Sequence, residues 1–337
     1  MNDSYNDSFQ YDLDYEDQVC EKAVVVKFGS YAVPIFFFIV ITLSLTGNIL
    51  VLIILALYEN LKSLTNIFIL NLAISDLVFT TGLPFWAMYS IWGWVFTTIL
   101  CKMVSFVFCI GFYSSILFLT SMTIYRYLTV VHPLFNLKTK SFSTGTFASF
   151  LLWAISIGAA MPSVLFITTM QVPHNGSFSL GCDYETHALR DIAAFQQNAV
   201  FLFAFAVMAF CYIRILGKIK RARSKTKNKA IKLVFCIVAV FFLGWVPYNV
   251  VIFLRRLAEG LVEPFNDCDI SIQLDHAYEV CRFIAFSHCC LNPVFYAFVG
   301  VKFRSHLKSM LYRMFICRNT VEEQQITLQV YSRGSMY

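Results

Sequence analysis

The chain has 337 residues and a mass of 38.6 kDa, with 58% hydrophobic and only 14% charged residues. An average soluble domain carries about 25% charged residues. The composition therefore excludes a soluble globular enzyme, a disordered protein and a disulfide-dense secreted domain, and it indicates a polytopic membrane protein.

Seven segments along the chain are almost free of Asp, Glu, Lys and Arg. A helix needs roughly 20 apolar residues to cross a hydrocarbon core of about 30 Å, and in lipid the backbone must satisfy its own hydrogen bonds. The sequence therefore predicts an all-α membrane protein, a bundle of seven transmembrane helices. The segments are Phe28–Tyr58, Ser63–Leu100, Met103–Tyr125, Ser141–Leu180, Ile192–Ile213, Leu233–Leu254 and Phe283–Val301.

The second and fourth segments are longer than one span, so each must include a turn outside the membrane. Pro173, Asn175 and Gly176 mark that turn in the fourth segment. We expect four parts: an acidic extracellular tail over 1–30, the helix bundle over 31–300, a short amphipathic eighth helix on the membrane surface over 301–316, and a cytosolic tail over 317–337. Prolines inside five of the predicted helices each remove a backbone hydrogen bond and can kink the helix.

Charge is unevenly distributed between the two sets of connections. One set, which includes the tail after Val301, holds 19 of the 26 Lys and Arg residues, and the other holds 7 of them and 16 of the 20 acids. The positive-inside rule places the first set in the cytosol. The N-terminus is then extracellular and the C-terminus cytosolic. Three Asn-x-Ser glycosylation acceptors, at Asn2, Asn6 and Asn175, all fall on the predicted outside.

Four cysteines lie on the predicted outer side, where disulfides form. They allow three pairings. We favour Cys101–Cys182 with Cys20–Cys268, because the second bridge would tie the ends of the ring of helices together. Cys317 follows the amphipathic basic stretch and is a candidate palmitoylation site, with a plain cytosolic thiol as the alternative.

Asp76 is the one acid deep within a predicted span, and an ionisable group there is costly and a candidate for function. Asn48, Ser115 and Asn292 could join Asp76 as oxygen ligands of a small cation or as hydrogen-bond partners. The alternative interpretation is a structural polar cluster. Arg126 lies 25 residues after Cys101, or about 37 Å along a helix at 1.5 Å per residue, so the two residues belong to opposite ends of the bundle.

Ordered motifs in six of the predicted helices resemble those of the rhodopsin-like G-protein-coupled receptors. The motifs are Gly47-Asn48, Leu72-Ala73-Ile74-Ser75-Asp76, Arg126-Tyr127, Trp153, Trp245-Val246-Pro247 and Asn292-Pro293-Val294-Phe295-Tyr296. Further motifs are similar to the chemokine receptors, and the XC-type (lymphotactin) subgroup is the most similar. These motifs are Leu83-Pro84-Phe85-Trp86, Trp92-Gly93-Trp94-Val95, Gly181-Cys182-Asp183-Tyr184, Cys281-Arg282 and Ser287-His288-Cys289-Cys290.

The resemblance implies a plasma-membrane receptor that binds a small basic chemokine outside the cell and couples to an inhibitory-type heterotrimeric G protein inside it. Chemokine binding would use the acid-flanked, sulfated tyrosines Tyr5, Tyr11 and Tyr15 of the tail and the pocket residues Trp86, Tyr248, Glu279 and Arg282. The switch region would contain Asp76, Asn48, Ser115, Trp245 and Asn292, with an allosteric sodium ion at Asp76 and no other cofactor. The residues implied in G-protein coupling are Arg126, Tyr212 and Tyr296.

The same resemblance implies arrestin and receptor kinases as further partners, because the cytosolic tail offers hydroxyl side chains for phosphorylation. The chain departs from the family at four positions. Tyr125 replaces the acid before Arg126, Arg282 replaces a glutamate, Gly82 replaces a threonine, and the usual fifth-helix proline is absent near Ala204. The XC-type receptors share the non-acid residue before the arginine, the arginine at the glutamate position and the missing proline.

Three other functions compete with a signalling receptor. Tyr125 suggests a scavenger or decoy receptor that binds chemokine without coupling, which the intact Arg126, Tyr212 and Tyr296 argue against. A transporter should show inverted repeats or paired midplane charges. An enzyme needs a nucleophile–base or metal constellation, and no set of histidines has ligand spacing. The net charge of +6 is also not a nucleic-acid signal, because the bases and acids are segregated along the chain.

Overall fold

The computed structural model describes residues 23–61, 63–132, 142–174, 177–222, 228–260, 262–265, 267–299, 303–310 and 312. Its helices and strands follow one another along the chain without an intervening domain. They are α2 (Ala23–Tyr58), α3 (Leu64–Trp92), α4 (Thr98–Val131), α5 (Phe142–Phe166), β1 (Ile167–His174), β2 (Ser177–Tyr184), α6 (His187–Ala222), α7 (Asn228–Glu259), α8 (Cys268–Phe286) and α9 (His288–Val299). Residues 303–310 are also helical.

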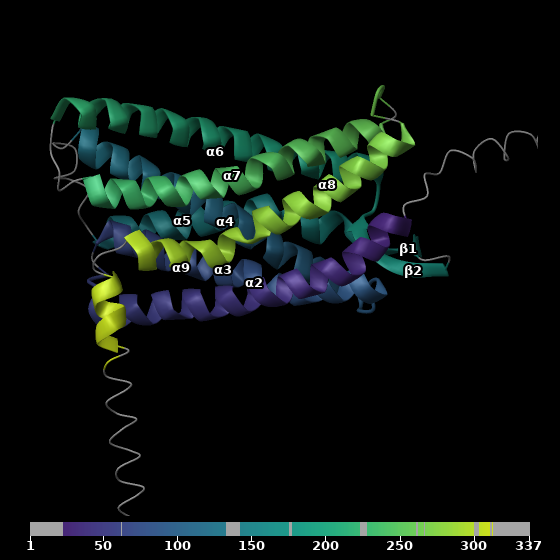
Figure 1. The fold of residues 1–337 in the computed structure, drawn as a ribbon, viewed down its shortest axis with the longest axis horizontal. Coiled ribbons are helices and arrows are strands. Elements are labelled where there is room, and N and C mark those ends of the chain that lie inside the picture. The colour runs from purple at the N-terminus through teal and green to yellow at the C-terminus, as the bar shows by residue number, and fades with distance from the viewer. Residues whose placement is uncertain are drawn as a thin grey trace, which may run out of the picture.

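The long helices run side by side along the longest axis of the molecule (Figure 1). The β1–β2 hairpin lies at one end of the bundle, which we call the hairpin end. The helix over residues 303–310 lies across the axis at the other end, which we call the opposite end. Six of the described helices, α2 to α7, are long and apolar enough to cross a membrane. Together with the α8–α9 segment they form the seven-helix bundle that the sequence predicts.

The seventh span differs from its prediction. A search for charge-free residues finds only Phe283–Val301, but the helical segment begins at Cys268 and is divided at Ser287 into α8 and α9. The charge-free stretch begins later than the helix because α8 carries Asp275, Glu279 and Arg282, whose charges are paired within the bundle. Charges that are paired inside the bundle are therefore the physical reason why charge alone marks this span poorly.

Other bounds also differ from the sequence prediction. α2 begins at Ala23, so residues 23–30 belong to a helix rather than to the predicted tail. The fourth predicted segment contains the end of α5 and then the hairpin, in which β1 pairs antiparallel with β2 from Ile167 opposite Tyr184 to His174 opposite Ser177. We predicted only a turn there, because the apolar residues that precede Pro173 look the same in a helix and in a short strand.

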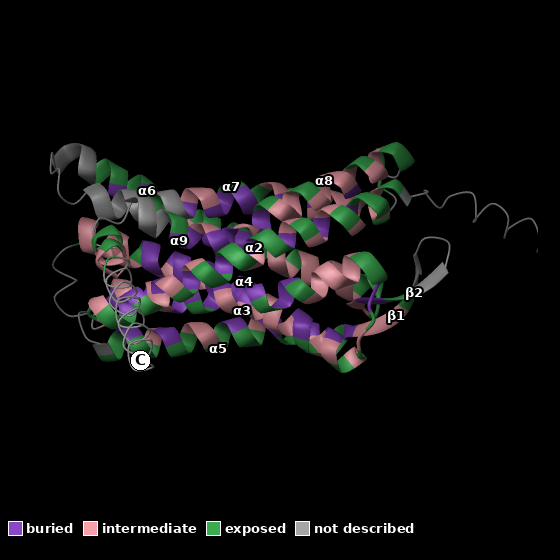
Figure 2. Cartoon of the chain, turned by 60° about the horizontal axis from the view of Figure 1, so that its bottom comes forward, coloured by how far each residue is buried: buried purple, intermediate pink, exposed green. Residues whose placement is uncertain are grey.

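The buried residues line the faces that the helices turn toward one another, and the exposed residues lie on the outward faces (Figure 2). α3 and α4 form the centre, since 61% of the residues in the most apolar window of each are buried, against 22% for α5. The five prolines expected within helices all lie inside them, and the helices continue through each one. These residues are Pro34, Pro84, Pro162, Pro247 and Pro293.

Gly111 allows the two central helices to approach closely. A Cβ atom at this position would lie 2.6 Å from the backbone nitrogen of Phe79 and 2.7 Å from its Cα. Backbone atoms cannot move aside as a flexible side chain can. The contact between α3 and α4 therefore requires a residue without a side chain at position 111.

We expect Gly111→Ala to separate α3 from α4 and to destabilise the purified protein by about 1–3 kcal/mol, the usual cost of overpacking. The measurement is the thermal unfolding midpoint in lipid nanodiscs. Gly158→Ala is the matched control, because nothing lies within 4 Å of a Cβ at Gly158. Equal midpoints for the two variants would show that the close approach at Gly111 does not limit stability.

Candidate functional site

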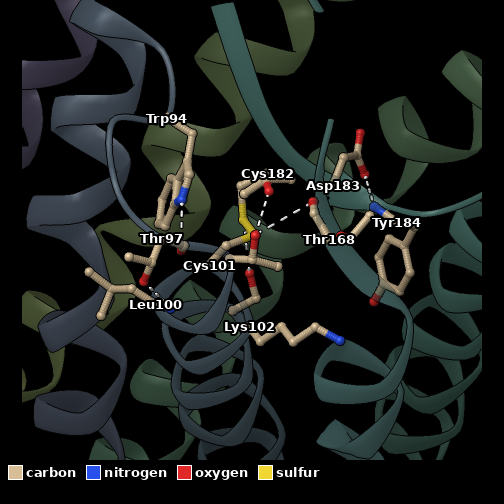
Figure 3. Close-up of a disulfide and its surroundings, with 12 residues drawn as sticks. Trp94, Thr97, Leu100, Cys101, Lys102, Thr168, Cys182, Asp183 and Tyr184 are labelled. Carbon is tan, nitrogen blue, oxygen red and sulfur yellow. Dashed lines mark hydrogen bonds between the residues drawn. A yellow bond between two sulfur atoms is a disulfide. The ribbon is translucent and has the colours of Figure 1, made fainter. Parts of the chain in front are cut away.

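A disulfide joins the start of α4 to strand β2 at the hairpin end. Cys101 and Cys182 are bonded, with their Cα atoms 5.8 Å apart, as the sequence predicts. Thr97 caps α4 by accepting a hydrogen bond from the backbone nitrogen of Leu100 at 3.3 Å. Figure 3 shows that the Lys102 side chain extends away from the bridge, and its Nζ donates to the backbone oxygen of Val164 in α5 at 3.0 Å. The hairpin is thereby attached to the central helix of the bundle.

The second predicted disulfide is only partly within the described structure. Cys268, the first residue of α8, is disulfide-bonded. Its expected partner Cys20 lies outside the described residues, so this pairing stays a prediction. The other tail and surface residues named from the sequence also lie outside the described residues: Tyr5, Tyr11, Tyr15, Asn2, Asn6, Asn175 and Cys317.

Three of the four predicted pocket residues belong to one cluster between α7 and α8. The ring of Tyr248 stacks on that of Tyr278, with centroids 5.6 Å apart. The guanidinium group of Arg282 lies 5.6 Å from the centroid of the same Tyr278 ring. Arg282 and Glu279 form an ion pair with each other, and each side chain is only 15% exposed.

The fourth predicted pocket residue, Trp86 of α3, belongs to an adjacent aromatic group. Its ring lies 6.3 Å from that of Phe108, which lies 5.0 Å from Phe286, and Phe286 lies 5.8 Å from Tyr248. The structure therefore links Trp86 to the other three pocket residues through two phenylalanines.

Sequence reasoning missed three members of this cluster. Arg255 of α7 bonds Asp275 of α8 through its Nε at 2.7 Å, and its guanidinium carbon lies 4.3 Å from the Tyr278 ring centroid. A guanidinium over an aromatic face is a favourable cation–π contact. A signal was available, because positions 275, 278, 279 and 282 recur at helical spacing and therefore share one face of α8.

The predicted polar cluster around Asp76 is present at the centre of the bundle. The Asp76 side chain is fully buried. It accepts a hydrogen bond from Nδ2 of Asn292 at 2.7 Å and one from Oγ of Ser115 at 3.3 Å. Nε2 of His288 lies 3.9 Å from Oδ1 of the same carboxylate. Asp76 thus joins α3 to α4 and to α9.

Asn48 makes no hydrogen bond to Asp76 in the described structure but has a related role in the same layer. Pro293 has no N–H, so it cannot donate to the carbonyl of Cys289 one turn earlier in α9. Nδ2 of Asn48 donates to that carbonyl at 2.8 Å instead. Gly47 makes this contact sterically feasible, because a Cβ there would lie 2.8 Å from Cβ of Pro293.

The donor set around Asp76 fits a sodium ion in part. Two oxygen-bearing groups, the Asp76 carboxylate and the Ser115 hydroxyl, face each other and suit a hard cation. Asn292 presents its amide nitrogen to the carboxylate, and Asn48 points its nitrogen at α9. Among the described residues no group of three or more His, Cys, Asp or Glu side chains could hold a metal ion. Oδ1 of Asn48 is buried and has no hydrogen-bond partner among the described residues. The sodium ion stays a prediction, with Asp76, Ser115, Asn48 and Asn292 as its candidate ligands.

Trp245 connects the aromatic cluster to the polar one. Its ring lies 5.4 Å from Tyr248 on one side and 5.3 Å from His288 on the other. It is 1% exposed and also packs on Phe112 of α4, with centroids 4.5 Å apart. The predicted switch residue therefore lies between the pocket residues and Asp76.

The residues predicted to contact a G protein lie toward the opposite end. Arg126, in the last turns of α4, is half-buried, and its Nε has no hydrogen-bond partner among the described residues. Tyr212 of α6 is buried and packs edge-on against Phe235 of α7 at 5.3 Å. The Tyr296 side chain lies outside the described part of the structure.

Comparison with known proteins agrees with this arrangement. Residues 47–296 match the family of 7 transmembrane receptors (rhodopsin family). The chain is 43% identical to human chemokine XC receptor 1 over 310 residues, which cover 92% of this chain and 89% of the relative. It is 40% identical to the mouse chemokine XC receptor 1, over 91% of this chain and 92% of the relative, and 38% identical to human C-C chemokine receptor type 1, over 90% and 86%.

We expect Glu279→Gln and Arg282→Gln to reduce stability by about 1–3 kcal/mol each, because each leaves one charge of a buried pair without its partner. The double variant should recover part of this loss, since it removes both charges. Thermal unfolding midpoints of the four proteins measure this coupling. Strictly additive losses would contradict a mutual ion pair.

The described structure thus combines a hairpin fastened by a disulfide, an aromatic and charged cluster at the hairpin end, a buried acid at the centre and an arginine toward the opposite end. This organisation agrees with the similarity to receptors along nearly the whole sequence. The chain belongs to the rhodopsin family of seven-transmembrane receptors and, within it, to the chemokine receptors, which are not enzymes.

Proposed function

We propose that this chain is a plasma-membrane receptor for an XC-type, lymphotactin-like chemokine and that it signals through an inhibitory-type heterotrimeric G protein. Calcium release and chemotaxis would follow from ligand binding. The observation that carries the proposal is the continuous set of contacts from the charged cluster at the hairpin end, through Trp245, to Asp76 at the centre. The similarity to two XC receptors supports the ligand class.

The hairpin end faces the outside of the cell in this proposal. The distribution of charge along the sequence supports this orientation, because the bases concentrate in the connections of the opposite end. A chemokine body would bind the acidic tail, whose negative charge attracts a basic partner and speeds association. Sulfated Tyr5, Tyr11 and Tyr15 would add charge to that surface.

The flexible end of the chemokine would then enter the cluster between α7 and α8. The ion pair of Glu279 and Arg282 supports a ligand that offers both charges. A ligand amine would replace Arg282 as the partner of Glu279, and a ligand carboxylate or carbonyl would replace Glu279 as the partner of Arg282. A ligand with only one of these groups would leave the other side chain with an unpaired charge in a site that is only 15% exposed.

When the ligand rearranges this cluster, Trp245 would transmit the rearrangement to the polar residues around Asp76. A sodium ion at Asp76 would balance the buried negative charge there. At the opposite end, Arg126, Tyr212 and Tyr296 would contact the G protein once α7 moves outward, as in the family. Receptor kinases and arrestin would act on the tail over 317–337.

The proposal is tested with a panel of chemokines on cells that express the full chain, read by calcium release, by inhibition of cAMP formation and by sensitivity to pertussis toxin. We expect an XC-type chemokine to give all three responses. Binding and uptake of that chemokine without a cAMP response would instead identify a decoy receptor. The absence of binding by any chemokine would reject the proposal.

Tyr125 leads to a separate prediction. An acid before Arg126 would supply a neighbouring counter-ion that this chain lacks. We expect Tyr125→Asp to lower ligand-free signalling about two- to tenfold, as an ion pair of about 0.5–1.4 kcal/mol would. G-protein activation per receptor at the cell surface measures it, and Tyr125→Phe, which removes only the hydroxyl, is the control. Unchanged or higher ligand-free signalling in the Asp variant would refute the idea.

A further inference from the structure

Five charged side chains join β2, α6 and α7 at the hairpin end, outside the predicted pocket. Arg190, in the first turn of α6, lies 2.9 Å from Oδ2 of Asp183 in β2 and 3.7 Å from Oε2 of Glu259, the last residue of α7. Arg256 of α7 lies 3.6 Å from Oδ1 of Asp191 in α6. We call Asp183, Arg190, Asp191, Arg256 and Glu259 the hairpin-end clamp.

Glu259 connects the two arginines of the clamp. Its Oε2 lies 2.6 Å from NH1 of Arg256, and its Oε1 accepts a hydrogen bond from NH2 at 2.9 Å, so the Arg256–Glu259 contact uses both carboxylate oxygens. The same Oε2 faces Arg190 across the gap between the helices. One carboxylate therefore belongs both to a pair within α7 and to a pair between α6 and α7.

The clamp is shielded enough from solvent for its charges to act on one another. The Arg256 side chain is 10% exposed and that of Arg190 is 24% exposed, while the three acids are 36–41% exposed. Partial burial weakens screening by salt relative to a fully exposed pair. A network of this kind contributes more than an isolated surface pair. Loss of Glu259 would leave Arg256 close to Arg190 with one fewer negative charge between them.

The clamp is placed where it can restrain the movement of α7. Asp183 follows Cys182, whose disulfide attaches β2 to α4, so one side of the clamp is fixed to the centre of the bundle. On the other side, Glu259 lies 12 residues beyond Pro247, or about 18 Å along the helix. A tilt of α7 about Pro247 would displace Glu259 from Arg190 and Arg256 from Asp191.

We propose that Arg190 and Glu259 are positioning residues of this receptor and that the hairpin-end clamp restrains the tilt of α7 in the absence of ligand. The inference rests on the proposed function only where it concerns signalling. The restraint itself concerns the bundle alone and is measurable without a ligand or a G protein. Opening the clamp increases the population in which α7 is displaced.

The first experiment compares Glu259→Gln with the parent chain in lipid nanodiscs by hydrogen–deuterium exchange and mass spectrometry. Loss of the two links that meet at Glu259 should speed exchange in the final turns of α7 and the first turns of α6 by about two- to tenfold, and 0.5 M salt should reduce the difference. Glu263→Gln is the matched control, because it removes the same charge four residues later from an exposed position that has no ion pair within the described part of the chain. If Glu259→Gln does not fold, Arg190→Gln replaces it.

Swapping the charges of residues 256 and 259 distinguishes a restraint between helices from stabilisation of α7 by its own ion pair. The double variant Arg256→Glu with Glu259→Arg keeps an ion pair within α7, but it places Glu beside Asp191 and Arg beside Arg190. The clamp predicts exchange at least as fast as in Glu259→Gln. Exchange as slow as in the parent chain would show that only the pair within α7 matters and would overturn the inference.

The second measurement is ligand-free G-protein activation per receptor at the cell surface. Glu259→Gln should raise it about two- to tenfold, and Glu263→Gln should leave it unchanged. A hydrogen-exchange rate in Glu259→Gln equal to that of the parent chain overturns the clamp, whether or not the receptor signals. Faster exchange in a receptor that no chemokine activates supports the clamp and counts against the proposed function, so the two failures are distinguishable.

Discussion

A backbone carbonyl or a carboxylate inside a membrane-spanning bundle is costly without a hydrogen-bond partner, because lipid supplies none, and two such groups lie at the centre of this molecule. The first is the carbonyl of Cys289, which Pro293 leaves without its helical donor and which Asn48 satisfies at 2.8 Å. The second is the carboxylate of Asp76, which takes its donors from Asn292 and Ser115. Both groups are bonded by side chains from other helices, and the relative positions of α2, α3, α4 and α9 depend on these bonds.

The charged groups at the hairpin end differ from the central polar groups in how they are paired and in how far they are exposed. There the ion pairs form between neighbouring helices, within α7 and within α8, and they are partly exposed rather than fully buried. Arg255 and Arg282 both lie against the ring of Tyr278, so a single tyrosine organises charges from α7 and α8. Such an arrangement can exchange partners when a charged ligand arrives, whereas the layer of Asp76 cannot do so without leaving a buried group unpaired.

The sequence was sufficient for the number of spans, the Cys101–Cys182 bridge and the contacts of Asp76 with Ser115 and Asn292, because apolar length, cysteine placement and isolated buried polar residues are strong local signals. It was insufficient for the start of α8 and for the hairpin. A charged residue that finds its counter-ion on another helix looks in the sequence like a residue in water. A short apolar strand likewise looks like the end of a helix. The sequence also did not reveal that Asn48 donates to the carbonyl that Pro293 leaves free, since only three-dimensional proximity shows it.

The division at Ser287 makes the seventh span a jointed element rather than a single rod. Across the joint the chain is held by short-range hydrogen bonds, from the nitrogen of Ser287 to Phe283 and from the nitrogen of Cys290 to the oxygen of Ser287. The ion-paired residues Glu279 and Arg282 and the Asp76 partner Asn292 therefore belong to two consecutive helices of one span rather than to a single helix.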